Sequence, residues 1–193
     1  MDQQHNTFWP IKLDTVESWA YWDNAFSKEE CEKIIKLGNT LVKKEGTVFG
    51  ENKDFRKSDV SWLYPCDDTN WLYKRLTDIV EELNKRYFKF DIDGFGEGLQ
   101  FTHYKEPDGK YKKHVDKGYN GLTRKLSFTL QLSDPDTYEG GDLLMHIDDP
   151  GQKVERKQGK LVMFPSYVLH EVTPVTKGER YSLVAWLTGK PFK

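Results

Sequence analysis

The sequence predicts an α+β fold in which helices cover one side of a barrel-like or sandwich-like β-core. Residues 15–90 contain two stretches with apolar side chains at helical spacing. From Gly98 onward the sequence changes to about eight short runs of alternating residues, which Gly, Pro and Asp separate. Such runs are typical of antiparallel sandwiches and barrels. Because the helices come first, we expect them to pack outside one sheet.

The first helix is predicted to begin after Ser27, because Ser27 and Glu30 have the spacing of a capping box. Its expected buried face includes Gly38, where we expect another backbone to approach closely. The apolar residues of that face are Cys31, Ile34, Ile35, Leu41 and Val42.

The second helix is predicted to follow the polar run 67–69, which has the composition of a helix start. Its apolar residues recur at helical spacing, which indicates one buried face. They are Leu72, Leu76, Ile79, Val80, Leu83 and Tyr87.

The charged segment 43–57 joins the two predicted helices and contains Gly46 and Gly50. It is interpreted as a solvated connector, and the alternative is a flap that covers a substrate. A short strand is predicted to follow it, because Val60, Trp62 and Tyr64 alternate with other residues.

The predicted β-core spans about 98–189, and the helical support in front of it spans about 15–90. No linker divides the chain, so we expect a single domain over residues 1–193. The predicted core strands are 99–105, 111–116, 123–133, 142–147, 153–157, 160–165, 168–173 and 180–188.

The charge balance gives no reason to expect a nucleic-acid or membrane partner. Lys and Arg total 29 and Asp and Glu total 31, for a formal net charge of −2. Two cysteines, Cys31 and Cys66, are too few for a disulfide scaffold. No signal peptide is expected, and no apolar run approaches the roughly 18 residues of a membrane span. We therefore expect a cytoplasmic protein, as a monomer or a weak dimer.

The first candidate metal-binding motif is His114-Val115-Asp116. Residues two apart on a strand point to the same face, so His114 and Asp116 can bind one ion while Val115 points away. The alternative to metal binding is a surface histidine beside a solvated aspartate. A third ligand must come from elsewhere, and His170 is the best candidate, with His146 as its rival. Two histidines and one carboxylate leave three octahedral positions open, which is the arrangement in non-haem iron(II) oxygenases.

A candidate anion clamp follows His170 by ten residues. Arg180 and Ser182 share one face of a predicted strand. A guanidinium matches a carboxylate, and a serine hydroxyl can add one hydrogen bond. The pair can bind the distal carboxylate of 2-oxoglutarate, and the alternative for Arg180 is a surface salt bridge.

These residues, in this order, resemble the prolyl 4-hydroxylase-like branch of the 2-oxoglutarate and Fe(II)-dependent dioxygenases, especially its oxygen-sensing and bacterial types. The likeness covers most of the chain and is strongest from Tyr104 to the end. Further matching segments are 126–133, 138–143, 164–166, 170–175 and 178–180, with Trp186 after them. Upstream, 55–56 and 60–62 resemble the strand that borders the substrate groove in these enzymes.

The resemblance implies a double-stranded β-helix fold and a set of site residues. His114, Asp116 and His170 would bind Fe(II), and Arg180 would bind 2-oxoglutarate, with Tyr104 near the cosubstrate. A tyrosine that relatives often use for the cosubstrate is missing. The strand where they place it contains Thr129 and Gln131 instead.

The implied activity is hydroxylation of an unactivated C–H bond with O₂, in a prolyl residue of a peptide or protein, with release of succinate and CO₂. Ascorbate is a further expected cofactor. The aromatic residues Trp62, Tyr64, Tyr111, Tyr119 and Tyr167 could line a peptide groove, although ordinary core or surface packing is the favoured explanation for most of them.

Other functions stay open at this point. A free amino acid or another small metabolite is the main alternative substrate. A nucleic-acid demethylase of the same superfamily is disfavoured, because Trp186 stands where that branch usually has a second arginine. The remaining alternatives are a non-enzymatic jelly-roll binding protein and a hydrolytic zinc site. Hydrolysis at a zinc site would not need the carboxylate-binding pair Arg180 and Ser182.

Overall fold

The computed structural model describes residues 15–46, 54–116, 122–191 of the chain. Its N-terminal part contains the strand β1 (Ala20–Trp22), the helix α1 (Lys28–Thr40), the short strands β2 (Lys44–Glu45) and β3 (Arg56–Lys57), the strand β4 (Asp59–Leu63) and the helix α2 (Asn70–Leu83). A π-helical turn, Asn84–Phe88, continues α2. The strands that follow are β5 (Gly94–Phe95), β6 (Leu99–Lys105), β7 (Gly109–His114), β8 (Arg124–Gln131), β9 (Tyr138–Gly140), β10 (Leu143–Met145), β11 (Gln152–Lys153), β12 (Leu161–Pro165) and β13 (His170–Thr188).

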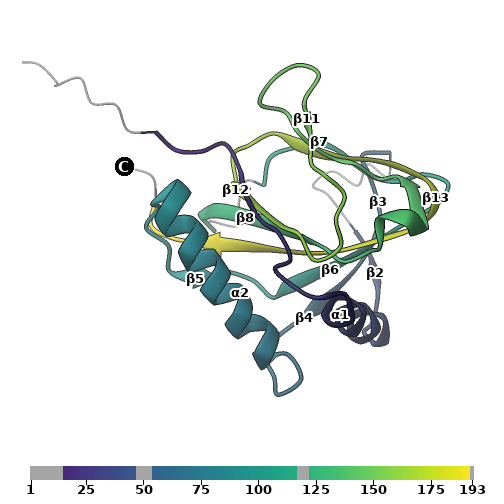
Figure 1. Cartoon of the computed structure of the whole chain (residues 1–193), viewed down its shortest axis with the longest axis horizontal. Helices are drawn as coiled ribbons and strands as arrows, with labels where there is room; N and C mark the ends of the chain where they lie inside the picture. Colours follow the sequence, from purple (N-terminus) through teal and green to yellow (C-terminus); the bar gives the residue numbers. More distant parts are fainter. Residues whose placement is uncertain (1–14, 47–53, 117–121, 192–193) are drawn as a thin grey trace, which may run out of the picture.

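Two antiparallel sheets share the long strand β13 (Figure 1). The major sheet has the order β1-β12-β8-β13-β6-β4-β2, and it uses the C-terminal part of β13. The minor sheet uses the N-terminal part of β13, which pairs with β7, β9 and β10. β13 therefore connects the two sheets, and residues on its inner face line the space between them.

The continuity of β13 corrects the prediction of two separate strands at 168–173 and 180–188. The register of β13 shifts between Val172 and Val175 against β7, and between Val175 and Lys177 against β9. These irregularities let the strand bend from one sheet to the other without a turn. Gly178 has φ 73°, a conformation that favours glycine, and it lies at this bend. The predicted strand 153–157 is also wrong, since β11 ends at Lys153.

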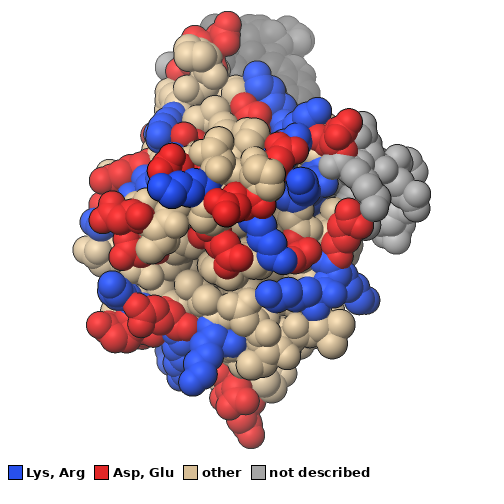
Figure 2. Space-filling model, turned by 90° about the vertical axis from the view of Figure 1, so that its right-hand side faces the viewer, with Lys and Arg blue, Asp and Glu red and all other residues tan. Residues whose placement is uncertain are grey.

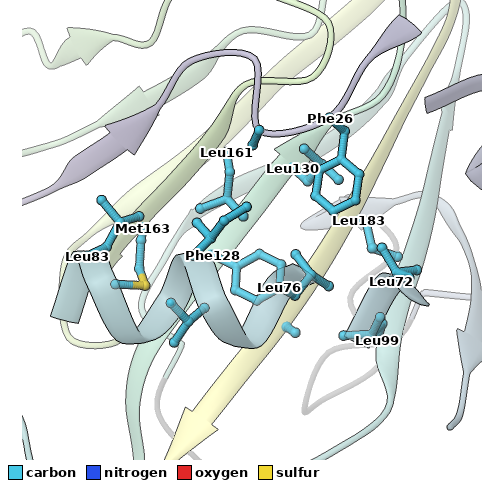
Figure 3. Packing of buried hydrophobic residues seen from close by; sticks show 14 of the residues in the cluster. Phe26, Leu72, Leu76, Leu83, Leu99, Phe128, Leu130, Leu161, Met163 and Leu183 are labelled. Atoms are coloured by element: carbon cyan, nitrogen blue, oxygen red, sulfur yellow. The ribbon is translucent and has the colours of Figure 1, made fainter. Parts of the chain in front are cut away.

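Both helices pack on the outer face of the major sheet, as expected from their position in the chain (Figure 1). Figure 3 shows this packing, in which leucines of α2 meet side chains from β6, β8, β12 and β13. The labelled members are Phe26, Leu72, Leu76, Leu83, Leu99, Phe128, Leu130, Leu161, Met163 and Leu183. The α+β layout with helices on one sheet is therefore confirmed.

Helix α1 begins as predicted but ends earlier. The Ser27 amide donates to Glu30 Oε2 over 2.8 Å, and the Glu30 amide donates to Ser27 Oγ over 3.3 Å, which completes the capping box. The helix ends at Thr40, and Val42 is 83% exposed, so its expected burial is wrong. At Gly38 the close neighbour is the ring of Phe101 and not a backbone, since a Cβ there would lie 2.5 Å from Phe101 Cγ.

The π-helical turn after α2 corrects the predicted face of that helix. An α-helical continuation from Leu83 would bury Tyr87, four residues later. The wider turn shifts the buried position by one residue, so that Phe88 is 1% exposed and Tyr87 is 37% exposed. The other predicted apolar positions of α2 are buried.

The predicted strand around Val60 corresponds to β4, which ends at Leu63. Tyr64 lies beyond it and is 63% exposed. The ends of segment 43–57 form β2 and β3, and its centre, residues 47–53, lies outside the described residues, so the flap hypothesis is untested. None of the described helices is long and apolar enough to cross a membrane.

A second apolar cluster fills part of the space between the two sheets. It consists of Tyr104, Leu143, Met145, Val154, Val162, Phe164, Val168, Val172 and Val175. These side chains come from both sheets and from the turns between strands. The cluster forms the apolar base on which the candidate site is built.

Candidate active site

The three predicted metal ligands meet at one point between the sheets. His114 is the last residue of β7, Asp116 follows it by two residues, and His170 begins β13. The antiparallel register sets His170 directly opposite His114. His114 Nε2 lies 3.7 Å from Asp116 Oδ1, and His170 Nε2 lies 3.6 Å from Asp116 Oδ2. The three ligand atoms all lie within 4.8 Å of one another, which suits a single ion.

Backbone carbonyls fix the orientation of both imidazoles. His114 Nδ1 lies 2.7 Å from the Lys112 carbonyl oxygen, and His170 Nδ1 lies 2.9 Å from the Val168 carbonyl oxygen. A carbonyl only accepts, so each Nδ1 carries the proton and donates it. Each Nε2 then presents its lone pair toward Asp116. Hydrogen bonds from Nδ1 to a backbone carbonyl are typical of histidines that bind metals through Nε2.

Electrostatics keep His114 and Asp116 in the protonation states that a metal requires. Burial, followed by the nearby His170, lowers the pKa of His114 to about 4. Burial alone would raise the pKa of the Asp116 carboxyl, but the two imidazoles, together with the nearby Trp186 and Ser127 side chains, outweigh burial and lower this pKa. A neutral imidazole and a carboxylate are therefore present at neutral pH. This donor set fits Fe(II).

Arg180 and Ser182 lie further along β13 and point into the same space. Arg180 is 2% exposed, and its Nη1 donates to Ser182 Oγ over 3.4 Å. Its Nη2 is buried and has no hydrogen-bond partner in the described part of the chain. Tyr104 lies opposite on β6, with its ring centroid 5.3 Å from the Arg180 guanidinium carbon. An unsatisfied buried guanidinium fits an anionic ligand such as a carboxylate.

One cavity connects the ligand set with Arg180. Of the two residues expected at the position of the missing tyrosine, Thr129 lines this cavity and Gln131 does not. The Gln131 side chain instead donates from Nε2 to the backbone carbonyl oxygen of Glu155 over 2.8 Å. The lining residues are Arg56, Gln100, Thr102, Tyr104, Tyr111, His114, Asp116, Thr129, Leu143, His170, Val172, Arg180, Ser182, Val184 and Trp186.

Sequence reasoning did not assign several of these lining residues. Arg56, Gln100 and Thr102 are buried polar residues from β3 and β6 that face the cavity. Arg56 precedes Ser58 and Val60 at alternating positions, and segment 55–56 resembles the strand that borders the substrate groove, so the sequence placed it near the groove without giving it a role. Nothing local in the sequence brings β3 against β7, so the position of Arg56 depends on the tertiary fold.

The remaining histidines of the described chain lie elsewhere. His146 Nε2 is 2.8 Å from Glu171 Oε1 and does not join the ligand set, so the rival ligand is not favoured. His103 points to the opposite face of β6 from Tyr104 and stacks on Tyr181 with ring centroids 4.2 Å apart.

The predicted aromatic groove is only partly assembled. Tyr111 lines the cavity, and the ring of Trp62 lies 6.2 Å from that of Trp186. Tyr64 and Tyr167 are exposed, and Tyr119 lies outside the described residues. Over the face shown in Figure 2, Lys and Arg are interspersed with Asp and Glu, which matches the near-neutral charge.

A buried His-Asp-His set and an unsatisfied arginine between two sheets define the class of sites that bind a metal together with an organic acid. Residues 99–188 match the family model described as the 2OG-Fe(II) oxygenase superfamily, so this part of the chain is similar to that superfamily. The description implies Fe(II), 2-oxoglutarate and O₂ as the reagents of the family. The resemblance seen in the sequence is thereby confirmed.

Similar proteins include hydroxylases of one type. A PKHD-type hydroxylase of Synechococcus elongatus is 35% identical over 127 residues, which cover 62% of this chain and 56% of that protein. A PKHD-type hydroxylase of Prochlorococcus marinus is 28% identical over 167 residues, which cover 83% of this chain and 73% of that protein. The chain thus matches little more than half the length of the first of these relatives.

Solved structures show the same fold. A prolyl-4-hydroxylase of Pseudomonas putida matches with a TM-score of 0.71 and 21% identity, covering 90% of this chain and 94% of that one. A prolyl hydroxylase of Trichoplax adhaerens, solved with a peptide fragment of the hypoxia inducible factor, matches with a TM-score of 0.74 and 18% identity, covering 89% of this chain and 84% of that one. The predicted double-stranded β-helix is therefore confirmed.

Proposed function

We propose that the protein is an Fe(II)- and 2-oxoglutarate-dependent dioxygenase that hydroxylates a prolyl residue in a peptide or protein. The observation that carries this proposal is the single cavity that contains both the His114, Asp116 and His170 set and the unsatisfied Nη2 of Arg180. A metal-binding set alone would also suit zinc hydrolysis, but hydrolysis gives the buried Nη2 of Arg180 no anionic partner.

In this proposal His114, Asp116 and His170 hold the iron. When bound, Fe(II), 2-oxoglutarate and O₂ supply the oxidation, and 2-oxoglutarate leaves as succinate and CO₂. Arg180 binds the distal carboxylate, and Ser182 keeps the guanidinium in position through its hydroxyl. The Tyr104 ring beneath Arg180 fixes the plane of the guanidinium.

Apolar side chains restrict water around the reacting groups. Leu143, Val172 and Val184 are the apolar aliphatic residues among those that line the cavity. A dry cavity strengthens the electrostatic contacts of Arg180 and Asp116 and protects reactive species from side reactions. The protein therefore supplies ligands, orientation and exclusion of water, while the cofactors carry the chemistry.

The prolyl substrate is supported by names and titles of similar proteins. The structural neighbours include prolyl hydroxylases, one of them solved with a peptide. We also propose that ascorbate sustains turnover, that the protein is cytoplasmic, and that it is a monomer or a weak dimer. These finer assignments rest on the family resemblance and on composition.

Succinate release from 2-oxoglutarate tests the proposed activity. The assay compares wild type with His114→Ala and Asp116→Ala over a panel of prolyl peptides and free amino acids, with and without ascorbate. We expect both variants to lose peptide-dependent succinate release and bound iron while keeping the circular dichroism spectrum of the wild type. His146→Ala is the matched control and is expected to keep both. Turnover at wild-type rate in either ligand variant would remove these residues from the site.

A further inference from the structure

A second buried arginine lines the cavity beside Arg180. Arg56 is 8% exposed and comes from β3, directly opposite Tyr111 on β7. In the part of the chain that the structure describes, no carboxylate lies within 4.0 Å of either arginine. Buried charges in proteins are normally paired, so a buried arginine without an anion indicates that its partner is a ligand.

Neutral partners hold the Arg56 guanidinium in one orientation. Its Nε donates to Ser58 Oγ over 2.9 Å, and its Nη2 donates to Gln100 Oε1 over 2.8 Å. Gln100 Oε1 also accepts from Thr102 Oγ1 over 3.3 Å. A Cβ at Gly46 would lie 2.7 Å from Arg56 Nε, so the absence of a side chain there leaves room for the guanidinium. The arginine is thus fixed before any ligand binds, which favours recognition.

Arg56 lies close to the metal-binding set, and its contact on β6 differs from that of Arg180. Its guanidinium carbon is 4.5 Å from the Tyr111 ring centroid, and the Tyr111 and His114 ring centroids are 3.4 Å apart. Its partner Gln100 is four residues from Tyr104, the neighbour of Arg180, along β6. Four residues of strand span about 13 Å at 3.3 Å per residue. The two arginines are therefore held at different positions along β6.

The charges of a loaded cavity do not balance. Arg56, Asp116 and Arg180 are the charged residues among those that line it, besides the two histidines, which bind metals as neutral imidazoles. With iron(II) and 2-oxoglutarate bound, Asp116 and the two carboxylates of the cosubstrate offset all but one of the positive charges. The remaining positive charge is assigned to Arg56, because Arg180 faces the distal carboxylate in the proposed complex.

We propose that Arg56 binds a carboxylate of the molecule that is oxidised. The inference rests on the proposed function and narrows its substrate to molecules with an anionic group close to the reacting carbon. Two sources share this chemistry: the free carboxylate of a small amino acid or of a chain end, and the side chain of an acidic residue beside the target in a peptide.

Binding to matched acid and amide compounds tests this assignment. The probes are proline with prolinamide, and prolyl pentapeptides that differ only in a free or amidated C-terminus or in one Glu-to-Gln change. Affinity is measured by ligand-observed NMR on the protein loaded with Zn²⁺ and N-oxalylglycine, so no turnover is needed. The variants are Arg56→Gln and Arg56→Lys, and Lys57→Gln is the control that removes a neighbouring charge from an exposed side chain.

In at least one pair, we expect wild type and Lys57→Gln to bind the acid about tenfold more tightly than the amide, which corresponds to about 1.4 kcal/mol. Arg56→Gln should bind both members alike, and Arg56→Lys should keep a smaller preference. The pair that responds identifies the source of the carboxylate.

Acids and amides that bind wild type alike would overturn the assignment, as would pairs in which neither member binds. The assignment would also be overturned if Arg56→Gln still bound the acid more tightly than the amide, or if that variant bound N-oxalylglycine more weakly than wild type. Failure of the oxygenase proposal is a separate result: wild type would bind neither metal nor N-oxalylglycine. If Arg56→Gln does not fold, Arg56→Lys carries the comparison.

Discussion

His170 Nε2 lies 3.6 Å from Asp116 Oδ2, although one residue begins β13 and the other follows β7. The pairing of His170 with His114 across the minor sheet produces this contact. Both imidazoles turn their unprotonated nitrogen toward the same carboxylate because backbone carbonyls hold their Nδ1 atoms. Strand register therefore brings the ligands together, and the hydrogen bonds from Nδ1 to backbone carbonyls orient the two imidazoles.

Arg180→Ala should weaken 2-oxoglutarate binding. A hydrogen bond to a charged group contributes about 1.5–3 kcal/mol, which corresponds to roughly 10- to 150-fold in affinity. Isothermal titration of the metal-loaded protein with the cosubstrate measures the change. Lys177→Ala is the control, because Lys177 lies on the same strand with an exposed side chain and a surface ion pair. An unchanged affinity in Arg180→Ala would remove Arg180 from the cosubstrate site.

Thr129 and Gln131 should differ in effect although both lie on β8. Thr129→Val removes a hydroxyl that lines the cavity, and we expect 2-oxoglutarate binding to weaken by about 2- to 10-fold if one neutral hydrogen bond is lost. Gln131→Leu removes the bond to the Glu155 carbonyl and should lower the free energy of unfolding by about 0.5–1.5 kcal/mol. Titration and urea unfolding measure the two quantities. The opposite pattern would assign the cosubstrate contact to Gln131.

His103 should make the stability of the protein sensitive to mild acid. Burial lowers its pKa below the ordinary 6.5, although Glu179 opposes this effect, and Lys43 and Lys105 add to the lowering. The unfolded chain then binds more protons than the folded protein as pH falls below 6.5, so this contribution to stability is lost in that direction. His103→Phe keeps an aromatic ring against Tyr181 and cannot titrate.

Thermal unfolding of wild type and His103→Phe at several pH values measures this effect. We expect the Tm of wild type to fall more steeply than that of the variant between pH 6.5 and about 5. The comparison stops there because Glu179, whose pKa is lowered from 4.5, loses its contribution at lower pH. Parallel Tm curves would show that His103 titrates alike in the folded and unfolded states.

Phe88 and Tyr87 provide a matched test of the π-helical turn. Phe88→Ala should lower the free energy of unfolding by about 3–5 kcal/mol, because its ring is 1% exposed. Tyr87→Ala should change it by about 0.5 kcal/mol or less, because its side chain lies at the surface. Urea unfolding measures both. A larger loss in Tyr87→Ala would indicate a regular α-helical continuation of α2.

Local patterns in the sequence predicted much of the fold and part of the site. Two-residue spacing put His114 and Asp116 on one face, and the same rule put Arg180 beside Ser182. His170 was a candidate by residue type and family resemblance, since spacing cannot relate residues on different strands.

Features that depend on distant pairing were not predictable from local patterns. The bulges that keep β13 continuous require partners in two other strands. The π-helical turn puts Phe88 in the buried position expected for Tyr87. Because both residues are aromatic, their type could not indicate which one is buried. The resemblance placed Arg56 on a strand beside the substrate groove, but its contact with Gln100 depends on the pairing of β3 with β7.

The most direct test is a crystal structure from crystals grown without oxygen in the presence of Mn²⁺ and 2-oxoglutarate, because it shows whether one site holds both the metal and the cosubstrate. We expect one ion bound by His114 Nε2, His170 Nε2 and the Asp116 carboxylate, with the distal carboxylate of 2-oxoglutarate on Arg180. An ion bound elsewhere, for example between His146 and Glu171, or a cosubstrate that does not touch Arg180, would contradict the account.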